Sequence, residues 1–274
     1  MNLLLKETKT LLSQHQLWAK KRLGQHFLVD ENALETIVRT ARLQKGETVL
    51  EIGPGTGLLT ERLITQGIRL VAIEFDSGFY RLLQQKFAKE IASQRLILIY
   101  GDILKIKLED LPLSPSYKVV SNIPYQITAP LLEKLLACAK KPSLLVLLVQ
   151  KEVAEKIIAQ PPKMNRFALM VQFYGEPQVL KPIPKGSFWP QPPVDSAILR
   201  IIPQKFNFPV LQNLLFQLIR QAFGQRRKQL KNIFAIQWLE KAQIEPKLRA
   251  ENLSLADWLR LAQVVEENTQ EKFV

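Results

Sequence analysis

The sequence predicts an α/β fold in which a mostly parallel, doubly wound sheet precedes a smaller all-helical region. Three observations predict it. Up to about Gln204, short apolar runs alternate with amphipathic helical stretches. A glycine-rich turn, Gly53 to Gly57, separates the first of these runs from a helix. Beyond Gln204 only helical periodicity remains. We therefore expect two domains, residues 1–204 and 205–274.

The expected strands are short and apolar, as is typical of strands that are buried on both faces of a sheet. They cover residues 48–52, 69–74, 96–100, 117–121, 144–150 and 197–202. Helices are expected between them, and Asp30 can cap the first clear one. Residues 129–140 and 151–160 also have helical periodicity, whereas residues 177–183 are expected to be extended.

The composition is that of a globular chain with an excess of basic residues. The 274 residues are 47% hydrophobic, which is enough for a sizeable core, and no apolar run reaches membrane-spanning length. Lys and Arg outnumber Asp and Glu by 38 to 25, a net charge of +13. Such an excess aids solubility. In a chain of this size it also favours a polyanionic partner, with nucleic acid ahead of an anionic membrane surface.

Cysteine and histidine are scarce. The single cysteine, Cys138, excludes an internal disulfide and is typical of a reducing compartment, so a cytoplasmic location is expected. Two histidines far apart in the chain predict no metal site. Residues 1–20 lack the pattern of a signal or transit peptide.

The stretch Asn122-Ile123-Pro124-Tyr125 ends the fourth expected strand. Pro124 cannot donate to a sheet and favours an extended Ile123, so the turn should be rigid and direct an amide and an aromatic ring away from the strand end. An amide oxygen and a backbone carbonyl can accept both hydrogen bonds of a nucleobase amine, while the ring stacks on the base. An ordinary Pro-Tyr turn is the alternative.

Three further strand ends carry residues suited to a ligand. Gly53 and Gly55 allow a ligand to approach the backbone between a strand and a helix, although the spacing is neither G-x-G-x-x-G nor that of a P-loop. Glu74 ends the next strand, where an acid can bind ribose hydroxyls, and Asp102 ends the third. Each acid could instead cap a helix. Polar residues at successive strand ends, Asn122 included, favour one shared pocket.

Two segments later in the chain have open interpretations. Phe188, in an aromatic-proline loop, is either packed or a second wall for a base. Arg226, Arg227 and Lys228 form a basic run that we expect on a helix. Such runs are usually solvated, but the net charge of the chain favours contact with phosphates.

Taken together, these motifs resemble, in order, those of the ribosomal RNA adenine N6,N6-dimethyltransferases. They are Gly24 to Leu28, Glu51 to Gly55, Ile73-Glu74, Gly101-Asp102, Asn122 to Tyr125, Phe188 to Pro190, Val194 to Ala197, Gln225 to Lys228 and Arg249 to Ser254. The resemblance extends over about residues 20–265.

This resemblance implies a Rossmann-like S-adenosylmethionine-dependent methyltransferase sheet with a small all-helical C-terminal domain that binds rRNA. It implies dimethylation of two adjacent adenosines near the 3′ end of 16S rRNA in the small ribosomal subunit, by a monomer without metal or membrane attachment. The implied cofactor-binding residues are His26, Leu28, Gly53, Gly55, Glu74, Asp102 and Asn122. The implied catalytic residues are Asn122, Pro124 and Tyr125. The implied RNA contacts are Tyr125, Phe188, Arg226, Arg227 and Lys228.

The resemblance also suggests what each position does. His26 and Leu28 would cover the cofactor, and Gly53 would lie against its methionine end. Glu74 would hold the ribose, and Asp102 would contact the adenine ring.

At the centre of the reaction, Asn122 would lie where the cofactor meets the target amine. Tyr125 would stack on the target base. No strong base is needed, because the methylated amine becomes acidic, and this agrees with a site that has no histidine at its centre.

Two residues depart from the family pattern. His26 stands where some members have asparagine, and Pro193 stands where many have lysine, which puts one phosphate contact in question. Two alternatives remain: a 23S rRNA adenine dimethylase of the antibiotic-resistance type, and a non-catalytic ribosome assembly factor with the same fold.

Overall fold

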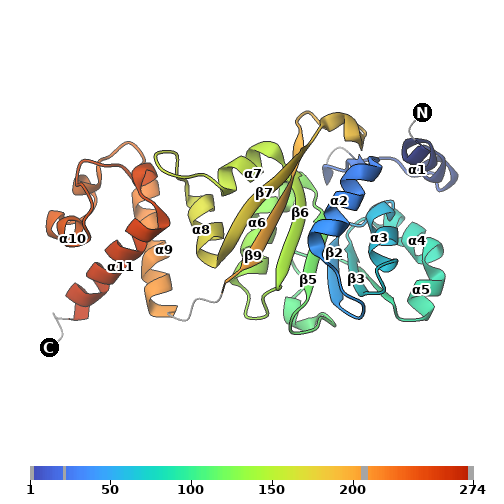
Figure 1. Ribbon diagram of the computed structural model, residues 1–274, viewed down its shortest axis with the longest axis horizontal. Coiled ribbons are helices and arrows are strands. Elements are labelled where there is room, and N and C mark those ends of the chain that lie inside the picture. The colour runs from blue at the N-terminus through green and yellow to red at the C-terminus, as the bar shows by residue number, and fades with distance from the viewer. Residues whose placement is uncertain (1–2, 21–22, 205–208, 271–274) are drawn as a thin grey trace. The chain divides into compact units, whose positions relative to one another are not determined.

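The computed structural model describes residues 3–20, 23–204 and 209–270. Lys21 and Arg22 lie outside the described residues, as do residues 205–208 at the predicted domain boundary. The chain divides into two compact units, drawn in Figure 1. The first comprises Met1–Ala154 and Glu176–Pro203, and the second Glu155–Gly175 and Gln204–Val274.

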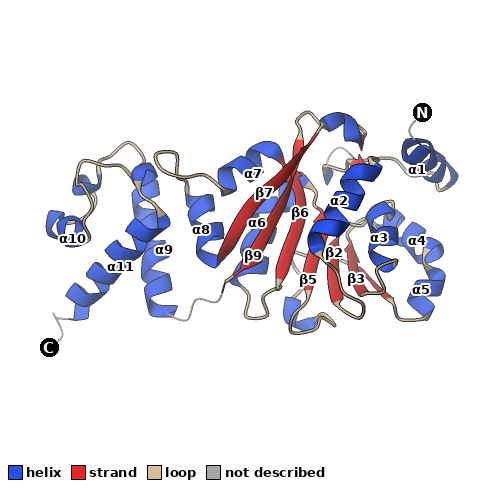
Figure 2. Ribbon diagram, in the orientation of Figure 1, coloured by secondary structure: helices blue, strands red, loops and turns tan. Residues whose placement is uncertain are grey.

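The first unit is built on a seven-stranded sheet with the order β4-β3-β2-β5-β6-β9-β7 (Figure 2). The strands are β2 (Thr48–Ile52), β3 (Arg69–Glu74), β4 (Leu96–Tyr100), β5 (Lys118–Asn122), β6 (Leu144–Gln150), β7 (Gly175–Ile183) and β9 (Ser196–Pro203). The pairings from β4 through β6 are parallel, and β9 pairs antiparallel with β6. The Rossmann-like architecture expected from the sequence is therefore present, with an antiparallel extension at one side.

The order of the strands creates a switch point between β2 and β5. From β2 the chain moves outward to β3 and β4, then returns to the other side of β2 as β5 and continues to β6. Right-handed crossovers then place the helix after β5 on the opposite face from those after β2 and β3. The turns after β2 and β5 thus diverge, and a crevice at the carboxyl ends of these two strands is the expected ligand site of such a sheet.

Helices cover the sheet and bury its apolar strands. They are α2 (Glu31–Ala41), α3 (Leu58–Ile64), α4 (Ser77–Lys86), α5 (Ala88–Ala92), α6 (Thr128–Ala137) and the short α7 (Lys151–Ile157), whose last residues belong to the second unit. Asp30 caps α2, as predicted, by accepting from the Ala33 N–H at 3.0 Å. α2 packs on β5 and β6, while α4 packs on β3 and β4.

An N-terminal helix and a small second sheet were not expected. α1 (Leu3–Gln14) buries Leu12, which packs with Phe27 and Phe79. β1 (Phe27–Leu28) pairs antiparallel with β8 (Phe188–Trp189), with Leu28 opposite Phe188. The stretch around Phe188 is therefore a short strand rather than only a loop.

The second unit is helical. It contains α8 (Arg166–Tyr174), α9 (Pro209–Phe223), α10 (Ile236–Lys241) and α11 (Leu255–Gln270). Trp258 is fully buried between the rings of Phe223 and Phe234, at centroid distances of 6.2 and 6.3 Å. Residues 155–175 join this unit, for example through a hydrogen bond from Met164 N to Glu251 O at 3.0 Å. That a separate rRNA-binding domain begins at residue 205 stays a prediction.

Candidate functional site

The glycine turn after β2 is the floor of the site. Gly53, Gly55 and Gly57 all have positive φ angles, between 57° and 79°, a conformation that favours glycine. A Cβ on Gly55 would lie 3.2 Å from the ring of Phe27, and one on Gly53 would lie 3.4 Å from Cδ of Pro124. Other residues are therefore disfavoured here mainly by the positive φ angles, and at Gly55 the ring of Phe27 would also have to shift slightly.

The turn after β5 faces the glycine turn. Ser121 ties the two strands together, because its hydroxyl donates to Ile52 O at 2.5 Å and its oxygen accepts from Ile52 N at 3.3 Å. Asn122 is the last residue of β5, and Tyr125 begins a short 3-10 turn. The Tyr125 hydroxyl lies 2.7 Å from the buried Ser196 hydroxyl, so its ring is held at both ends. Burial raises the pKa of Tyr125, although the Ser196 contact acts in the opposite direction.

Glu74 is buried at the end of β3 and is oriented by backbone donors. Its carboxylate accepts from Gly55 N at 3.0 Å and from Asp76 N at 2.8 Å. Burial raises its pKa to about 7 in spite of these hydrogen bonds. Glu74 thus connects the end of β3 to the glycine turn and changes its charge near neutral pH.

Glu51 is a second buried acid, and the sequence motifs assign it no role of its own. It lies within β2, is 1% exposed, and accepts a hydrogen bond from the Thr60 hydroxyl at 2.7 Å. Burial raises its pKa to about 8. The charge of Glu74 also acts to raise this pKa, whereas the hydrogen bond from the Thr60 hydroxyl acts to lower it. The sequence could have drawn attention to Glu51, because an acid inside the apolar run Thr48 to Ile52 requires an explanation.

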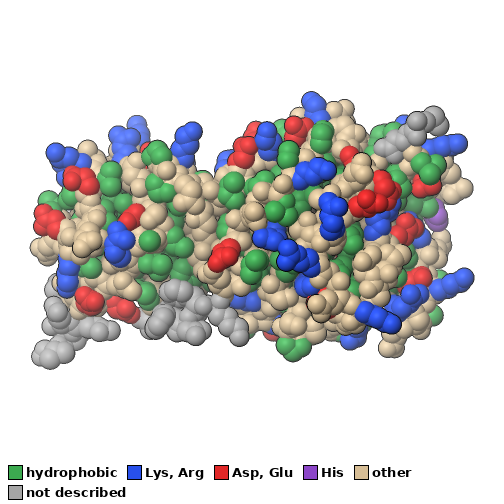
Figure 3. All heavy atoms as spheres, viewed as in Figure 1, with side chains coloured by type: hydrophobic (Ala, Val, Ile, Leu, Met, Phe, Trp, Pro, Cys, Tyr) green, Lys and Arg blue, Asp and Glu red, His purple; other side chains and the backbone are tan. Residues whose placement is uncertain are grey.

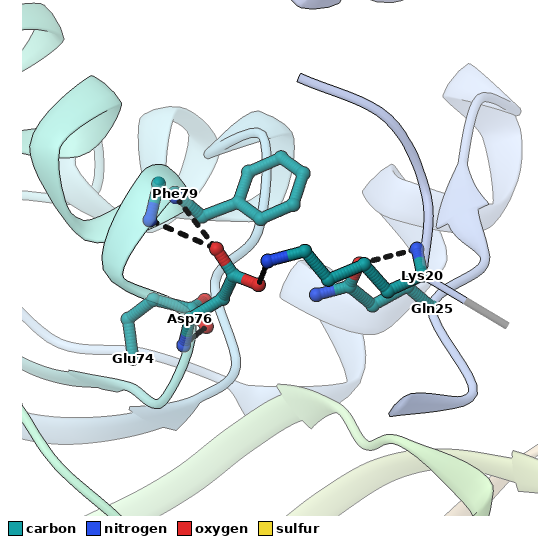
Figure 4. A network of polar contacts seen from close by, with 6 residues as sticks. Lys20, Gln25, Glu74, Asp76 and Phe79 are labelled. Atoms are coloured by element: carbon teal, nitrogen blue, oxygen red, sulfur yellow. Dashed lines mark hydrogen bonds and ion pairs between the residues drawn. The ribbon is translucent and has the colours of Figure 1, made fainter. Parts of the chain in front are cut away.

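Lys20, which precedes β1 in the chain, contacts Asp76 just after the end of β3 (Figure 4). Lys20 Nζ lies 2.5 Å from Asp76 Oδ2, and Lys20 N donates to Gln25 Oε1 at 2.8 Å. Asp76 also caps α4 by accepting from Gly78 N and Phe79 N. Although burial acts to raise the pKa of Asp76, the hydrogen bond from Lys20 and those from the helix backbone bring it below its usual value. Neither Lys20 nor Asp76 was predicted to belong to the site.

His26 lies at the centre of the site. Its ring stacks on Tyr125 at a centroid distance of 5.7 Å and an interplanar angle of 25°. Nδ1 lies 2.7 Å from Pro190 O, and the His26 carbonyl accepts from Asn122 Nδ2 at 3.2 Å. The expectation of a site without a central histidine is therefore wrong. The residue was predicted, but its contact with Tyr125 depends on a fold that brings residues 26 and 125 together.

Asp102 caps a turn and also faces a cavity. Its Oδ1 accepts from Leu104 N at 2.9 Å within a turn where no helix begins, so the helix-capping alternative is wrong and one oxygen caps the turn instead. Lys134 secures the same loop by donating to the carbonyls of Leu104 and Ile106. The side chain lines a cavity together with Glu74 and Gly53.

Most of the predicted site residues line two adjoining cavities. The first, here the Asn122 cavity, has a volume of about 70 Å³, and the second, the Asp102 cavity, about 160 Å³. Both are lined by Gln25, Gly53, Glu74 and Pro124, and so they adjoin at these residues. The Asn122 cavity is lined in addition by His26, Leu28, Glu51, Gly55, Asn122 and Tyr125.

Phe188 is not among the residues that line either cavity. Its side chain is 4% exposed and packs in the core beside Leu28, its partner in the β1–β8 pairing. A role as a second aromatic wall would require this side chain to leave the core.

Arg226, Arg227 and Lys228 are not helical, and that prediction is wrong. α9 ends at Phe223, and successive turns follow, with hydrogen bonds from Gly224 N to Arg220 O and from Lys228 N to Gln225 O. The chain leaves the helix because Leu230, two residues after Lys228, is fully buried and its N–H is bonded to Leu248 O. The three basic side chains are exposed.

Comparison with known proteins identifies the family. The sequence pattern described as "Ribosomal RNA adenine dimethylase" matches residues 17–267. The chain belongs to this family. A member from Dehalococcoides mccartyi, named ribosomal RNA small subunit methyltransferase A, is 39% identical over 97% of this chain and 94% of its own length. One from Rippkaea orientalis with the same name is 39% identical over 90% of this chain and 97% of its own length.

Solved structures agree on the fold of the family. A dimethyladenosine transferase from Plasmodium falciparum has a TM-score of 0.73 and 26% identity, covering 88% of this chain and 97% of that one. The 23S rRNA methyltransferase ErmE has a TM-score of 0.72 and 22% identity, covering 88% and 99%, and is evidence for the fold alone.

The described residues contain neither a metal-binding cluster nor a membrane-spanning helix. Within residues 3–20, 23–204 and 209–270, no group of three or more His, Cys, Asp and Glu side chains could hold a metal ion. No helix in the same ranges combines the length and the apolar character needed to cross a membrane.

Proposed function

We propose that this protein transfers methyl groups from S-adenosylmethionine to the N6 amines of two adjacent adenosines near the 3′ end of 16S rRNA, as a step in 30S subunit biogenesis. The observation that carries the proposal is the Asn122–Tyr125 turn, an amide and an anchored ring beside a glycine turn at the switch point of the sheet. Family membership and the name of the relatives support the same substrate. The protein would act as a monomer in the cytoplasm, where ribosomal subunits are assembled.

The residues around the two cavities fit S-adenosylmethionine, which supplies a methyl group on a positively charged sulfur. The absence of a side chain at Gly53 leaves backbone surface open between the two cavities. The Glu74 carboxylate, already fixed by two backbone donors, can accept from ribose hydroxyls. In the Asp102 cavity, Asp102 keeps one carboxylate oxygen for the amine of an adenine ring, because only Oδ1 is used in capping.

His26 and Leu28 would close the methionine end of the cofactor site. Both line the Asn122 cavity, and the segment that carries them is held down by the ion pair between Lys20 and Asp76. Leu28 presents an apolar side chain that is buried in the core, so it excludes water from this end of the cavity.

Asn122 would hold the target amine. Because a carbonyl only accepts, the bond to His26 O fixes the amide with Nδ2 toward His26, and no described residue donates to Oδ1. The second acceptor would be the Ile123 or the Pro124 carbonyl. Pro124 O already accepts from Ile127 N at 3.1 Å, which favours Ile123. Two acceptors would draw both N–H bonds of the amine to one side and localise its lone pair on the other.

Alignment of that lone pair with the methyl group would be the main source of catalysis, worth up to about 7–11 kcal/mol in ideal cases. The new C–N bond would replace the bond between the methyl carbon and the sulfur, whose electron pair would remain on a neutral thioether. The nitrogen would become acidic in this step, so its proton could pass to water. Tyr125 would stack on the base, at about 1–3 kcal/mol per stacked base, and offset the cost of removing the base from its own stack.

Arg226, Arg227 and Lys228 would contact the RNA backbone. They are exposed, and no ion pair of theirs is found within the part of the chain that the structure describes. On the face that Figure 3 shows, Lys and Arg side chains are spread over the surface rather than gathered in one patch. Contact with phosphates would therefore depend on the turn itself and on the net charge of +13 rather than on a basic patch on this face.

The test uses labelled S-adenosylmethionine with 30S subunits from cells that lack this methylation, and methylated 30S subunits as the control substrate. After digestion of the rRNA, the proposal expects labelled dimethyladenosine near the 3′ end in the first sample only. Label on 50S subunits alone would indicate a 23S rRNA methylase of the resistance type. The absence of label on both, with salt-sensitive binding to 30S, would indicate a non-catalytic assembly factor.

A further inference from the structure

The loop after β4 carries Asp102 and has little backbone support of its own. It comprises residues 101–107, here the Asp102 loop, and begins at the edge of the sheet, because β4 is the outermost strand in the sheet order. Gly101 N donates to Glu74 O at 2.9 Å, which ties the start of the loop to β3. From Asp102 to Ile106, no backbone N–H group of the described structure donates to a residue outside the loop. The position of the loop therefore depends on side chains.

Lys134 supplies such support from α6. Its ammonium group donates to Leu104 O at 3.0 Å and also to Ile106 O, so one side chain holds two carbonyls of the loop. Hydrogen bonds from a charged donor are stronger than those between neutral groups. Lys134 itself is half-buried, and its neighbours on the same helix, Leu131 and Leu135, are fully buried. Among the described residues, no other side chain outside the loop is hydrogen-bonded to the backbone of this loop.

Leu104 connects Lys134 to the carboxylate of Asp102. The Leu104 carbonyl accepts from Lys134, and the Leu104 N–H donates to Asp102 Oδ1 at 2.9 Å. A displacement of Leu104 would therefore turn the Asp102 carboxylate as well. The other oxygen, Oδ2, is the one assigned above to the amine of the adenine ring. Lys134 thus lies one residue behind this contact and lines neither cavity itself.

A simpler role for Lys134 would be stabilisation of α6. The residue lies in the last turn of this helix, where a cation interacts favourably with the helix dipole. However, its ammonium group is directed to the carbonyls of the Asp102 loop rather than to those of α6. A role in the helix alone would affect stability and leave cofactor binding unchanged, so the two roles can be separated by experiment.

We propose that Lys134 is a positioning residue for the cofactor, which holds the Asp102 loop so that the free oxygen of Asp102 meets the amine of the adenine ring. This inference rests on the proposed function, because it concerns the S-adenosylmethionine site. The adenine ring is remote from the methyl group that is transferred, so the contact contributes equally before and during the reaction. Lys134 therefore sets the affinity for the cofactor and not the rate of the chemical step.

The test begins with three single variants. Lys134→Met removes the donor and keeps a long apolar side chain, and Lys134→Arg keeps a charged donor. Lys140→Met is the matched control, because Lys140 Nζ makes the same kind of bond to Leu113 O, at 2.6 Å, and neither of these two residues lines a cavity of the site. The Kd for S-adenosylmethionine is measured by calorimetry without RNA, kcat and KM with unmethylated 30S subunits, and folding by thermal melting.

Lys134→Met should raise the Kd and the KM for S-adenosylmethionine about 5- to 100-fold, up to the loss of one hydrogen bond to a charged group. The kcat at saturating cofactor should stay within about twofold of the wild type. Lys134→Arg should restore most of the affinity, and Lys140→Met should bind the cofactor as the wild type does.

A double-mutant cycle shows whether Lys134 acts through Asp102. Asp102→Asn keeps an oxygen that can accept from Leu104 N and removes the second acceptor. In this background Lys134→Met should weaken cofactor binding by no more than about threefold, because the contact that it positions is already lost. A role confined to α6 predicts instead the same factor in both backgrounds.

Equal effects of Lys134→Met in the two backgrounds would overturn the inference, as would a lowered kcat with an unchanged Kd. If Lys134→Met does not fold, Lys134→Gln, which keeps a neutral donor, takes its place in the cycle. A wild-type protein that does not bind S-adenosylmethionine would overturn the proposed function together with this inference. A wild type that labels 30S subunits, with an unchanged Kd in Lys134→Met, would overturn the inference alone.

Discussion

The carboxyl edge of β2, β3 and β5 and the basic turn after α9 both carry polar side chains, but the surroundings differ completely. At the edge, Glu51, Glu74 and Tyr125 are largely buried and hydrogen-bonded to defined partners. In the turn, Arg226 to Lys228 are exposed and form no ion pair with any other described residue.

This difference between buried and exposed polar groups indicates how each region can contribute to function. Buried, oriented groups act together, so the loss of one disturbs the geometry of the rest and affects a chemical step or a specific ligand. Exposed charges act separately and through the ionic atmosphere of the RNA, so each contributes a similar, salt-dependent increment to binding. The predictions below test this contrast, in order of expected effect.

The largest effect is expected at the strand edge, for Asn122→Ala. Removal of the amide eliminates one of two acceptors for the target amine, and kcat on 30S subunits should fall by more than about 100-fold. Binding of S-adenosylmethionine, measured by calorimetry, should weaken only modestly. Asn32→Ala, at an exposed asparagine of α2, is the control and should behave as wild type. Wild-type turnover by Asn122→Ala would remove Asn122 from the mechanism.

Glu51 should make the protein less stable as pH rises. Its pKa is raised by burial to about 8, from 4.5, so the folded state retains a proton that the unfolded state has lost. The free energy of unfolding should therefore decrease between about pH 4.5 and 8, by up to a few kcal/mol, with Glu74 adding to the decrease below pH 7.

Denaturant unfolding of the cofactor-free protein at several pH values measures this dependence. Glu51→Gln carries no charge and should flatten the curve, above all between pH 7 and 8. Glu35→Gln, at an exposed position of α2, should not change it. An unchanged slope in Glu51→Gln would mean that the carboxyl group is already ionised in the folded protein.

Glu74 should make cofactor binding depend on pH in the opposite direction. Its pKa is raised by burial to about 7, and ribose hydroxyls are held best by the ionised form. As pH falls from 8 to 6, the Kd for S-adenosylmethionine should increase, by up to about tenfold per unit below the pKa. Titration calorimetry at three pH values measures this, and Glu74→Gln should bind weakly with little pH dependence. A Kd that is independent of pH in the wild type would contradict the assigned role.

The smallest effects belong to the basic turn. Arg226→Gln, Arg227→Gln and Lys228→Gln should each weaken 30S binding a few-fold and reduce the dependence of log K on log salt by about one. The kcat at saturating 30S concentration should be unchanged. Lys89→Gln, at an exposed lysine of α5, is the control for a general change in charge. A large loss of kcat from any one of the three would show that the turn is not an additive binding surface.

The sequence allowed the prediction of features that depend on neighbouring residues. Apolar runs that end in glycine, acid or Asn-Ile-Pro-Tyr located the strands and their ends. Of the three polar residues expected to share one pocket, Glu74 and Asn122 line the Asn122 cavity, whereas Asp102 lines only the adjoining Asp102 cavity. Parallel strands bring such ends to one edge whatever the details of the connections. For the same reason Glu51, an acid inside an apolar strand, could have been recognised.

Features that depend on distant residues were missed or misplaced. The burial of Phe188 results from pairing with Leu28, and the place of the His26 ring results from a bond to Pro190, 164 residues away. The end of α9 is set by the buried Leu230 and its bond to Leu248 rather than by the basic run itself. A single sequence contains no direct sign of such pairings.

The pairing of β1 with β8 has a consequence for the order of events during synthesis. A ribosome produces the glycine turn, Glu74 and Asn122 first, and these strands can assemble as they emerge. Pro190 and Ser196, which hold His26 and Tyr125, follow much later. A nascent chain that ends before them has the parts of a cofactor cradle without an anchored pair of rings. The fold thus postpones a finished site until β8 and β9 have been made, because Pro190 follows β8 and Ser196 begins β9.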